Sequence, residues 1–311
     1  MTVHTLRFEK DTYPVEAEDH DGLHIVLAEF GRRRLAPTLP APGWRDEIVA
    51  ETGHRLIEGA FVERERADVQ SLLSDVPDEA TAFVDWYQAL QQHGPGQGDP
   101  LFPWLADHAP LTAMRWFVEQ EAAGEAGFDD LVALTQVKLP TTAKLELARN
   151  YWDEMGRGNP RGMHGPMLDA LVRALKLRPR PEITVWQSLA LGNLMTALAA
   201  NRRYVFQSIG ALGAIEMTAP DRAQCVAKGL ARLGLDKASC HYFDLHAVLD
   251  RKHSADWNQE VIHSLVTMDS ALARPIAEGA LMRLIAGARC YERYRKEFNL
   301  EIGCSIGRAK T

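Results

Sequence analysis

Apolar side chains recur along this chain at the three- and four-residue spacing of amphipathic helices. The spacing holds from about residue 46 onward, where the strong helix formers Ala, Leu, Glu and Arg are abundant. Pro140, Pro220 and Gly234 mark some of the expected breaks between helices. The pattern predicts an all-α bundle, with helices over residues 111–124, 128–137, 141–155, 163–177, 183–200, 202–217, 220–233, 236–254, 256–271 and 273–298.

The first hundred residues carry a weaker pattern. Prolines and a glycine within residues 37–43 predict an irregular entry segment, and a short strand is expected near Leu23–Leu27. A second stretch rich in Gly and Pro covers residues 93–110. We therefore expect residues 1–105 to form a mainly helical extension that packs on a main helical bundle of residues 106–311.

Composition narrows the classes of partner. A chain of 311 residues that is 46% hydrophobic can bury a large core. Its net charge of −7 and lack of a basic block argue against nucleic-acid and anionic-membrane partners. The most apolar stretch, residues 183–200, is interrupted by polar side chains and is expected to be a buried helix. Four scattered cysteines, and an N-terminal segment MTVHTLRFEKD without an apolar core, predict a reducing, cytoplasmic location.

Ionisable residues occupy the apolar faces of three predicted helices. Glu154 lies seven residues after Leu147, His164 seven residues before Leu171, and Glu216 ends the apolar stripe of helix 202–217. A carboxylate buried without a partner costs several kcal/mol unless it takes up a proton, so such groups are usually paired with a cation. The cation could be a metal ion or a nearby arginine, for which the candidates are Arg149, Arg202 and Arg203.

A fourth helix presents three further donors on one face. His246, Asp250 and His253 stand at positions i, i+4 and i+7, so their side chains are stacked over two turns. Neutral imidazole and carboxylate suit iron, manganese or zinc, although a solvated helix face could show this spacing by chance. Together with the three inward residues they make three histidines and three carboxylates, enough to hold two metal ions. Asp244 is a candidate to orient one of the imidazoles.

These residues resemble the ligand pattern of the haem-oxygenase-like di-iron oxidases and oxygenases, a family of iron-containing redox enzymes. The resemblance runs from about Leu111 to Cys290 and rests on the segments NYWDEMGRG (150–158), IGALGAIE (209–216) and YFDLHAVLDRKH (242–253). The family order Glu, His, Glu, His-x3-Asp-x2-His is filled at all six positions. The resemblance implies the metal ligands Glu154, His164, Glu216, His246, Asp250 and His253.

The resemblance also implies a chemistry. Such an enzyme would use two Fe(II) ions, dioxygen as co-substrate and an external reductant, with no catalytic residue beyond the ligands. Its substrate would be a small amine, amino acid or fatty acid, which undergoes N-oxygenation or oxidative C–C or C–H cleavage. Glu121 and Glu125 are candidates for an additional ligand, and Tyr151 and Tyr242 are expected to line the pocket. A homodimer is also expected.

Other interpretations use the same sequence differently. A ferritin-like centre would need Glu-x-x-His on two helices, and the chain contains Glu51-x-x-His54 and Glu260-x-x-His263. A mononuclear site built only from the 246–253 helix would leave the inward glutamates unexplained. A metal-free helical protein that binds a small molecule, or a cofactor-free enzyme of the thiaminase-like bundle, is the alternative from another class. Iron content separates these alternatives.

Overall fold

The computed structural model describes residues 19–300. These residues form helices along most of their length, as the apolar spacing predicts. No strand occurs within this range apart from an isolated bridge between Met155 and Met163, so the prediction of an all-α fold is confirmed. The N-terminal segment and Cys304, which entered the expectation of a reducing location, lie outside the described residues. The helices are α1 (His20–Leu35), α2 (Trp44–Asp68), α3 (Ala80–His93), α4 (Leu101–Asp107), α5 (Leu111–Gly124), α6 (Phe128–Thr135), α7 (Thr141–Glu154), α8 (His164–Ala174), α9 (Trp186–Ala200), α10 (Val205–Arg232), α11 (Lys237–Asp256), α12 (Ser264–Met268) and α13 (Ala273–Glu297).

Two predictions about local structure were wrong. The expected strand near Leu23–Leu27 lies inside α1, because His24, Leu27 and Phe30 bury one helical face rather than alternate positions. The expected break at Pro220 does not occur, since α10 continues through it to Arg232. Proline removes only one helical hydrogen bond, and here its ring is buried among packed helices that hold α10 together.

Two smaller differences concern segments near predicted breaks. The Gly- and Pro-rich stretch 93–110 contains the short helix α4, which packs against α10. The predicted helix 256–271 is instead a π-helical turn, Trp257–His263, followed by α12. The π-helical turn continues from the end of α11 and places the fully buried Trp257 indole so that it donates to the Ile209 carbonyl at 3.2 Å.

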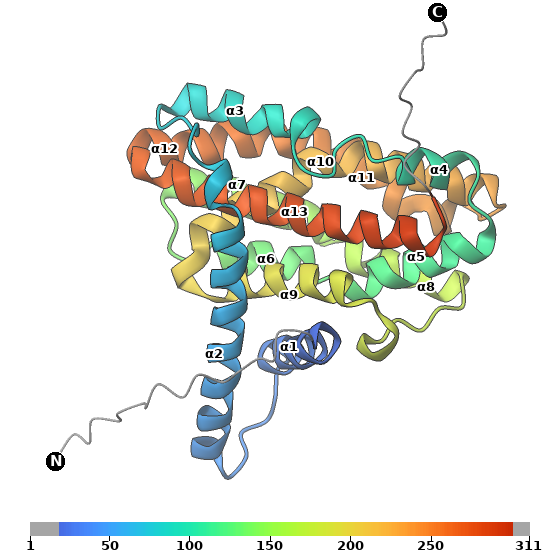
Figure 1. The fold of residues 1–311 in the computed structure, drawn as a ribbon, viewed down its shortest axis with the longest axis horizontal. Helices are drawn as coiled ribbons and strands as arrows, with labels where there is room; N and C mark the ends of the chain where they lie inside the picture. The colour runs from blue at the N-terminus through green and yellow to red at the C-terminus, as the bar shows by residue number, and fades with distance from the viewer. Residues whose placement is uncertain (1–18, 301–311) are drawn as a thin grey trace, which may run out of the picture.

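Helix α10 is the centre of the packing. It contacts α11 and α13 along much of its length, and α4 and α9 elsewhere. In Figure 1, α13 runs across the molecule, α3 lies along one side of it and α9 along the other, while α2 leads away from the bundle toward its own N-terminal end. That projecting end leaves Trp44 and Val49 exposed to solvent. None of the helices within residues 19–300 has both the length and the apolar character needed to cross a membrane.

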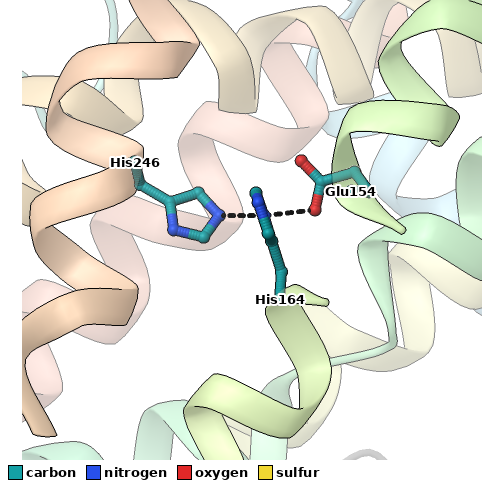
Figure 2. A group of neighbouring side chains, drawn as sticks. All are labelled: Glu154, His164 and His246. Carbon is teal, nitrogen blue, oxygen red and sulfur yellow. Dashed lines mark hydrogen bonds and ion pairs between the residues drawn. The ribbon is translucent and has the colours of Figure 1, made fainter. Parts of the chain in front are cut away.

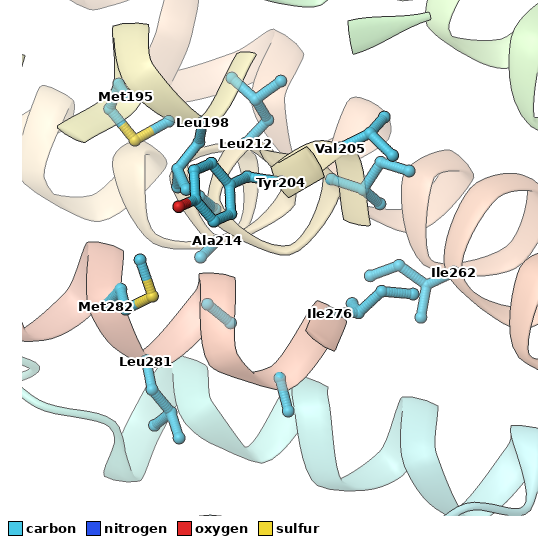
Figure 3. Packing of buried hydrophobic residues seen from close by; sticks show 14 of the residues in the cluster. Met195, Leu198, Tyr204, Val205, Leu212, Ala214, Ile262, Ile276, Leu281 and Met282 are labelled. Carbon is cyan, nitrogen blue, oxygen red and sulfur yellow. The ribbon is translucent and has the colours of Figure 1, made fainter. Parts of the chain in front are cut away.

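The main core forms where α9, α10 and α13 meet. Leu198, Leu212 and Ile276 are completely buried there, and Figure 3 shows their helices facing one another. The same apolar cluster includes Phe61 of α2 and Phe83 of α3, so helices before residue 105 contribute to it. The division of the chain at residue 105 stays a prediction.

Two glycines set the distance between α10 and α13. A Cβ atom added to Gly210 would lie 1.8 Å from the Ile276 carbonyl oxygen, and one added to Gly279 would lie 1.8 Å from the Gln207 carbonyl oxygen. Backbone atoms of packed helices cannot move aside as a flexible side chain can. The two helices therefore approach closely only because neither position carries a side chain.

We expect Gly279→Ala to destabilise the protein by about 3 kcal/mol or more, because α13 must separate from α10 to admit the methyl group. Gly53→Ala is the matched control, since a Cβ there would have nothing within 4 Å and the change adds helix propensity to α2. It should stabilise by up to about 1 kcal/mol. Urea unfolding of both variants measures the difference, and equal stabilities would contradict the close-packing argument.

Candidate metal centre

Two groups of donor atoms meet where α7, α8, α10 and α11 come together. In the first, His164 Nδ1 lies 2.6 Å from Glu154 Oε2 and 3.1 Å from His246 Nε2 (Figure 2). In the second, His253 Nδ1 lies 3.6 Å from Glu216 Oε2, and Glu154 again takes part. Within each group the donor atoms lie within 4.8 Å of one another. Glu154 belongs to both groups, so its carboxylate lies between two sites that could each hold an ion.

Asp250 belongs to neither group but lies beside both. Its side chain is buried, and it lines the same cavity as Glu154, Glu216 and His246. Its Oδ1 atom has no hydrogen-bond partner within the described residues. The structure therefore brings all six residues named from the sequence into one region, and their role as ligands stays a prediction.

A short closed loop brings Glu154 and His164 together. Glu154 ends α7 and His164 begins α8, and an antiparallel bridge between Met155 and Met163 joins the two helix ends. The turn is tight, because Gly156 has a φ of +61° and an added Cβ there would lie 2.3 Å from the carbonyl carbon of Gly162. Only glycine fits both constraints at low cost.

Helix ends explain part of the local electrostatics. Glu154 stands at the C-terminal end of α7, where the helix dipole is already negative, so its carboxylate gains from a nearby cation. His164 stands at the positive N-terminal end of α8, which favours the neutral imidazole that binds metals. In α11, His246 Nδ1 donates to the Tyr242 carbonyl at 2.7 Å in the tautomer that leaves Nε2 free to bind.

Two further residues orient the donors. Asp153 Oδ2 lies 3.1 Å from His253 Nε2, which directs His253 Nδ1 toward Glu216. Asn150 donates from Nδ2 to Glu216 Oε1 at 2.5 Å. Asp244, the candidate that the sequence suggested for this task, is exposed on α11 instead. The signal that could have pointed to Asn150 and Asp153 is their spacing with Glu154 at i, i+3 and i+4 of one helix.

Burial makes the acids of the centre difficult to ionise without a cation. It raises the pKa of Glu154 well above its ordinary range, and the negative charge of Glu216 raises it further. Burial, together with the negative charges of Glu216 and Glu154, raises the pKa of Asp250 to about 10. The arginine partners considered from the sequence lie elsewhere: Arg149 pairs with Glu146, Arg203 pairs with Glu63, and Arg202 donates to carbonyls near residue 135.

The imidazoles divide into two kinds. Burial lowers the pKa of His164 and of His246 to about 4, so both are neutral at physiological pH. Burial acts the same way on His253, but the adjacent carboxylates of Glu216 and Asp153 outweigh it and raise the pKa to about 9. In the metal-free chain the centre therefore holds protons on Asp250 and His253, and a bound cation would displace them.

The residues present fit a metal ion. Asp250 Oδ1 and His253 Nδ1 are buried atoms that lack a hydrogen-bond partner in the part of the chain that the structure describes. A buried polar atom left without a partner costs about 1–3 kcal/mol, and coordination would remove that cost. Imidazole nitrogens and carboxylate oxygens are donors for divalent iron, manganese or zinc.

A cavity of about 180 Å³ adjoins the centre. Tyr242 lines it as expected, whereas Tyr151 does not, and packs instead against the main apolar core. Glu121 and Glu125 line it as well, and neither belongs to the two donor groups. Glu121 accepts a hydrogen bond from the Tyr294 hydroxyl at 2.8 Å, and Glu125 from the Gly127 amide at 3.1 Å. The additional-ligand role of these glutamates stays a prediction.

The alternative Glu-x-x-His pairs do not meet. Glu51 pairs with Arg55 on α2, while His54 stacks on Phe30 with ring centroids 5.1 Å apart. Glu260 and His263 lie in the π-helical turn after α11. Neither pair appears among the donor groups found within residues 19–300.

The model of the iron-containing redox enzyme family matches residues 115–288, which is more than half of the 311-residue chain. The chain therefore belongs to this family of iron-containing redox enzymes. The matched range includes all six candidate ligands. No curated protein matches the chain.

Solved structures resemble the chain in fold. A crystal structure of a CADD-like protein of unknown function from Nostoc punctiforme, at 2.00 Å resolution, is 15% identical with a TM-score of 0.50. The match covers 78% of this chain and 98% of that one. A second structure of the same protein, at 1.35 Å resolution, matches with a TM-score of 0.48 at 15% identity, covering 78% of this chain and 96% of that one.

We expect Asp153→Asn to weaken Fe(II) binding by about 10- to 100-fold, because His253 loses the carboxylate that orients its ring. Asp244→Asn is the matched control, since it makes the same change on an exposed acid of α11 and should leave the affinity unchanged. Anaerobic Fe(II) titration against a competing chelator measures both. An effect of Asp244→Asn equal to that of Asp153→Asn would contradict the assignment.

The metal-free chain should lose stability as the pH rises between about 7 and 9. Folded Asp250 keeps its proton up to a pKa of about 10 and folded His253 up to about 9, against ordinary values of 3.8 and 6.5. The stability linked to these protons is complete below the ordinary pKa values and is lost as the pH rises through the pKa values of the folded chain. Asp250→Asn should make the fall shallower by about 1.4 kcal/mol per pH unit. Urea unfolding across this range measures the slopes, and equal slopes would refute the expectation.

Proposed function

We propose that the protein is a non-haem di-iron oxidoreductase that uses dioxygen to oxidise a small organic substrate. The observation that carries the proposal is the carboxylate of Glu154, which takes part in two adjacent groups of imidazole and carboxylate donors. Membership of the iron-containing redox enzymes supports iron as the metal. The substrate class on this proposal is an amine, amino acid or fatty acid, and an external reductant completes the turnover.

The residues divide between two positions. His164 and His246 would hold one ion together with Glu154 (Figure 2). Glu216 and His253 would hold the other, with Glu154 shared. Two iron ions would supply the electrons that dioxygen reduction requires. Asp250, buried beside both groups, would complete the donor set.

The chain's own residues prepare this chemistry before any ion binds. Asp153 holds the ring of His253, Asn150 holds the carboxylate of Glu216, and the Tyr242 carbonyl holds the ring of His246. Each contact fixes one donor atom toward the common centre, which lowers the cost of assembling the site. Apolar side chains such as Leu131 and Ile215 line the adjoining cavity and limit its water.

A metal-free binding protein is the rival from another class. It would have to keep three carboxylates, Glu154, Glu216 and Asp250, buried within one cavity wall with protonated His253 beside them and no arginine or lysine partner from within residues 19–300. Each acid in such a protein would be protonated or desolvated at a cost in folding free energy, and no bound metal ion would offset that cost. The donor arrangement therefore favours the metal enzyme.

Anaerobic loading with Fe(II) tests the proposal. We expect about two iron ions per wild-type chain and an optical change on rapid mixing with dioxygen. His246→Ala should retain about one ion, whereas Glu154→Ala should retain fewer, because Glu154 serves both donor groups. Asp250→Ala should lose the optical change, and Asp244→Ala, an exposed acid on the same helix, should behave as the wild type.

Stability measurements separate loss of metal from loss of fold. Metal-free Glu154→Ala should be at least as stable as the metal-free wild type, because the change removes a buried acid that is costly to ionise. Fewer than about one iron ion per wild-type chain would refute the di-iron proposal. Equal iron content in His246→Ala and Glu154→Ala would refute the shared role of Glu154.

A further inference from the structure

Two arginines line the cavity that adjoins the metal centre. Arg222 comes from α10 and Arg283 from α13, and both belong to the cavity wall together with Phe102 and Val226. Arg222 is six residues beyond Glu216 on the same helix, which is about 9 Å along its axis. The guanidinium groups and the metal-site carboxylates therefore share one cavity but occupy different parts of its wall.

Neither guanidinium forms an ion pair within the part of the chain that the structure describes. No carboxylate of residues 19–300 forms an ion pair with Arg222 or Arg283, although both face the same space. Arg283 Nε is buried without a hydrogen-bond partner in that part of the chain. Arg222 donates to the Thr218 hydroxyl at 2.8 Å, which is a neutral acceptor. Two positive groups therefore line the cavity without a carboxylate of residues 19–300 in ion-pair contact, although Glu121 and Glu125 belong to the same wall.

Several other partly buried arginines within residues 19–300 are paired with acids. Arg34 lies 2.6 Å from the carboxylate of Glu58, and Arg289 lies 2.7 Å from that of Glu65. Glu121, an acid of the same cavity wall, accepts a hydrogen bond from Tyr294 and forms no ion pair with either arginine. Burial lowers the pKa of Arg222, so its charge is poorly solvated and would gain from a bound anion.

We propose that Arg222 and Arg283 bind the carboxylate of the substrate and hold the rest of the molecule toward Glu154, His246 and Asp250. The inference rests on the proposed function, because it assigns a binding role to another part of the cavity that adjoins the metal centre. A guanidinium matches the two oxygens of a carboxylate, and the acids Glu121 and Glu125 in the same wall disfavour a more highly charged group such as a phosphate dianion.

The size of the cavity limits the rest of the substrate. An engineered cavity of about 150 Å³ holds one benzene molecule. The space of about 180 Å³ here suits a compact carboxylic acid with on the order of eight heavy atoms. Phe117, Leu191 and Val226 give it an apolar wall, so the remainder of the substrate is expected to be largely hydrocarbon.

Binding of hexanoate tests the assignment. Calorimetric titration is carried out on the metal-free protein and on protein loaded anaerobically with Fe(II), with hexan-1-amine and hexyl phosphate as comparison probes. We expect saturable binding of hexanoate and binding at least about tenfold weaker for the two comparison probes. Arg222→Met and Arg283→Met should each weaken hexanoate binding by at least about tenfold. Arg173→Met, which removes an exposed arginine of α8, should leave it unchanged.

The remaining outcomes separate this inference from its alternatives. Arg222→Lys and Arg283→Lys keep the charge, so they should bind hexanoate better than the methionine variants and guard against misfolding. No saturable hexanoate binding, hexanoate binding as tight in both methionine variants as in the wild type, or tighter binding of hexyl phosphate would overturn the assignment. Iron content reports on the proposed function separately: arginine-dependent binding in a chain that takes up no iron would refute the di-iron proposal alone.

Discussion

The burial of Glu154, Glu216 and Asp250 in one region is the constraint on which the rest of the structure depends. Burial and mutual repulsion raise the pKa of Glu154 and of Asp250, so the folded chain holds protons where a cation is absent. No arginine or lysine of residues 19–300 forms an ion pair with any of the three. The fold therefore keeps a site whose charge is balanced only by protons or by metal ions, and its histidines supply the remaining donors.

Helix α10 connects the buried acids to the rest of the bundle. Glu216 lies in its middle, with Gly210 on one side in close contact with α13 and Pro220 four residues beyond. Because Pro220 lacks an amide hydrogen, the Glu216 carbonyl loses its usual helical donor at the position that carries a metal-site side chain. A missing hydrogen bond within a helix costs stability, and the contacts of α10 with its neighbours on several sides offset that cost.

The sequence predicted what depends on periodicity and missed what depends on tertiary contact. Helical spacing placed Glu154, His164 and Glu216 on inward faces, and the structure brings them together with the donors of α11. The spacing of an isolated apolar run near residue 25 suits a strand or a helix equally, and only packing against α9 decides for the helix. Asp153 was missed in favour of Asp244 because the choice depends on which helix faces His253, which sequence spacing does not record.

The two charged regions of the cavity impose a direction on whatever binds there. The donor atoms of the metal centre suit cations, whereas Arg222 and Arg283 attract an anion and repel a metal ion. On the proposed assignment, a molecule with a single carboxylate therefore places its charge at the arginines and its hydrocarbon toward the metal centre. An orientation set by charge needs no specific contact to the reacting part of the substrate. The cavity can then select a class of molecule by its acid group while leaving the chemistry to the metal-site residues.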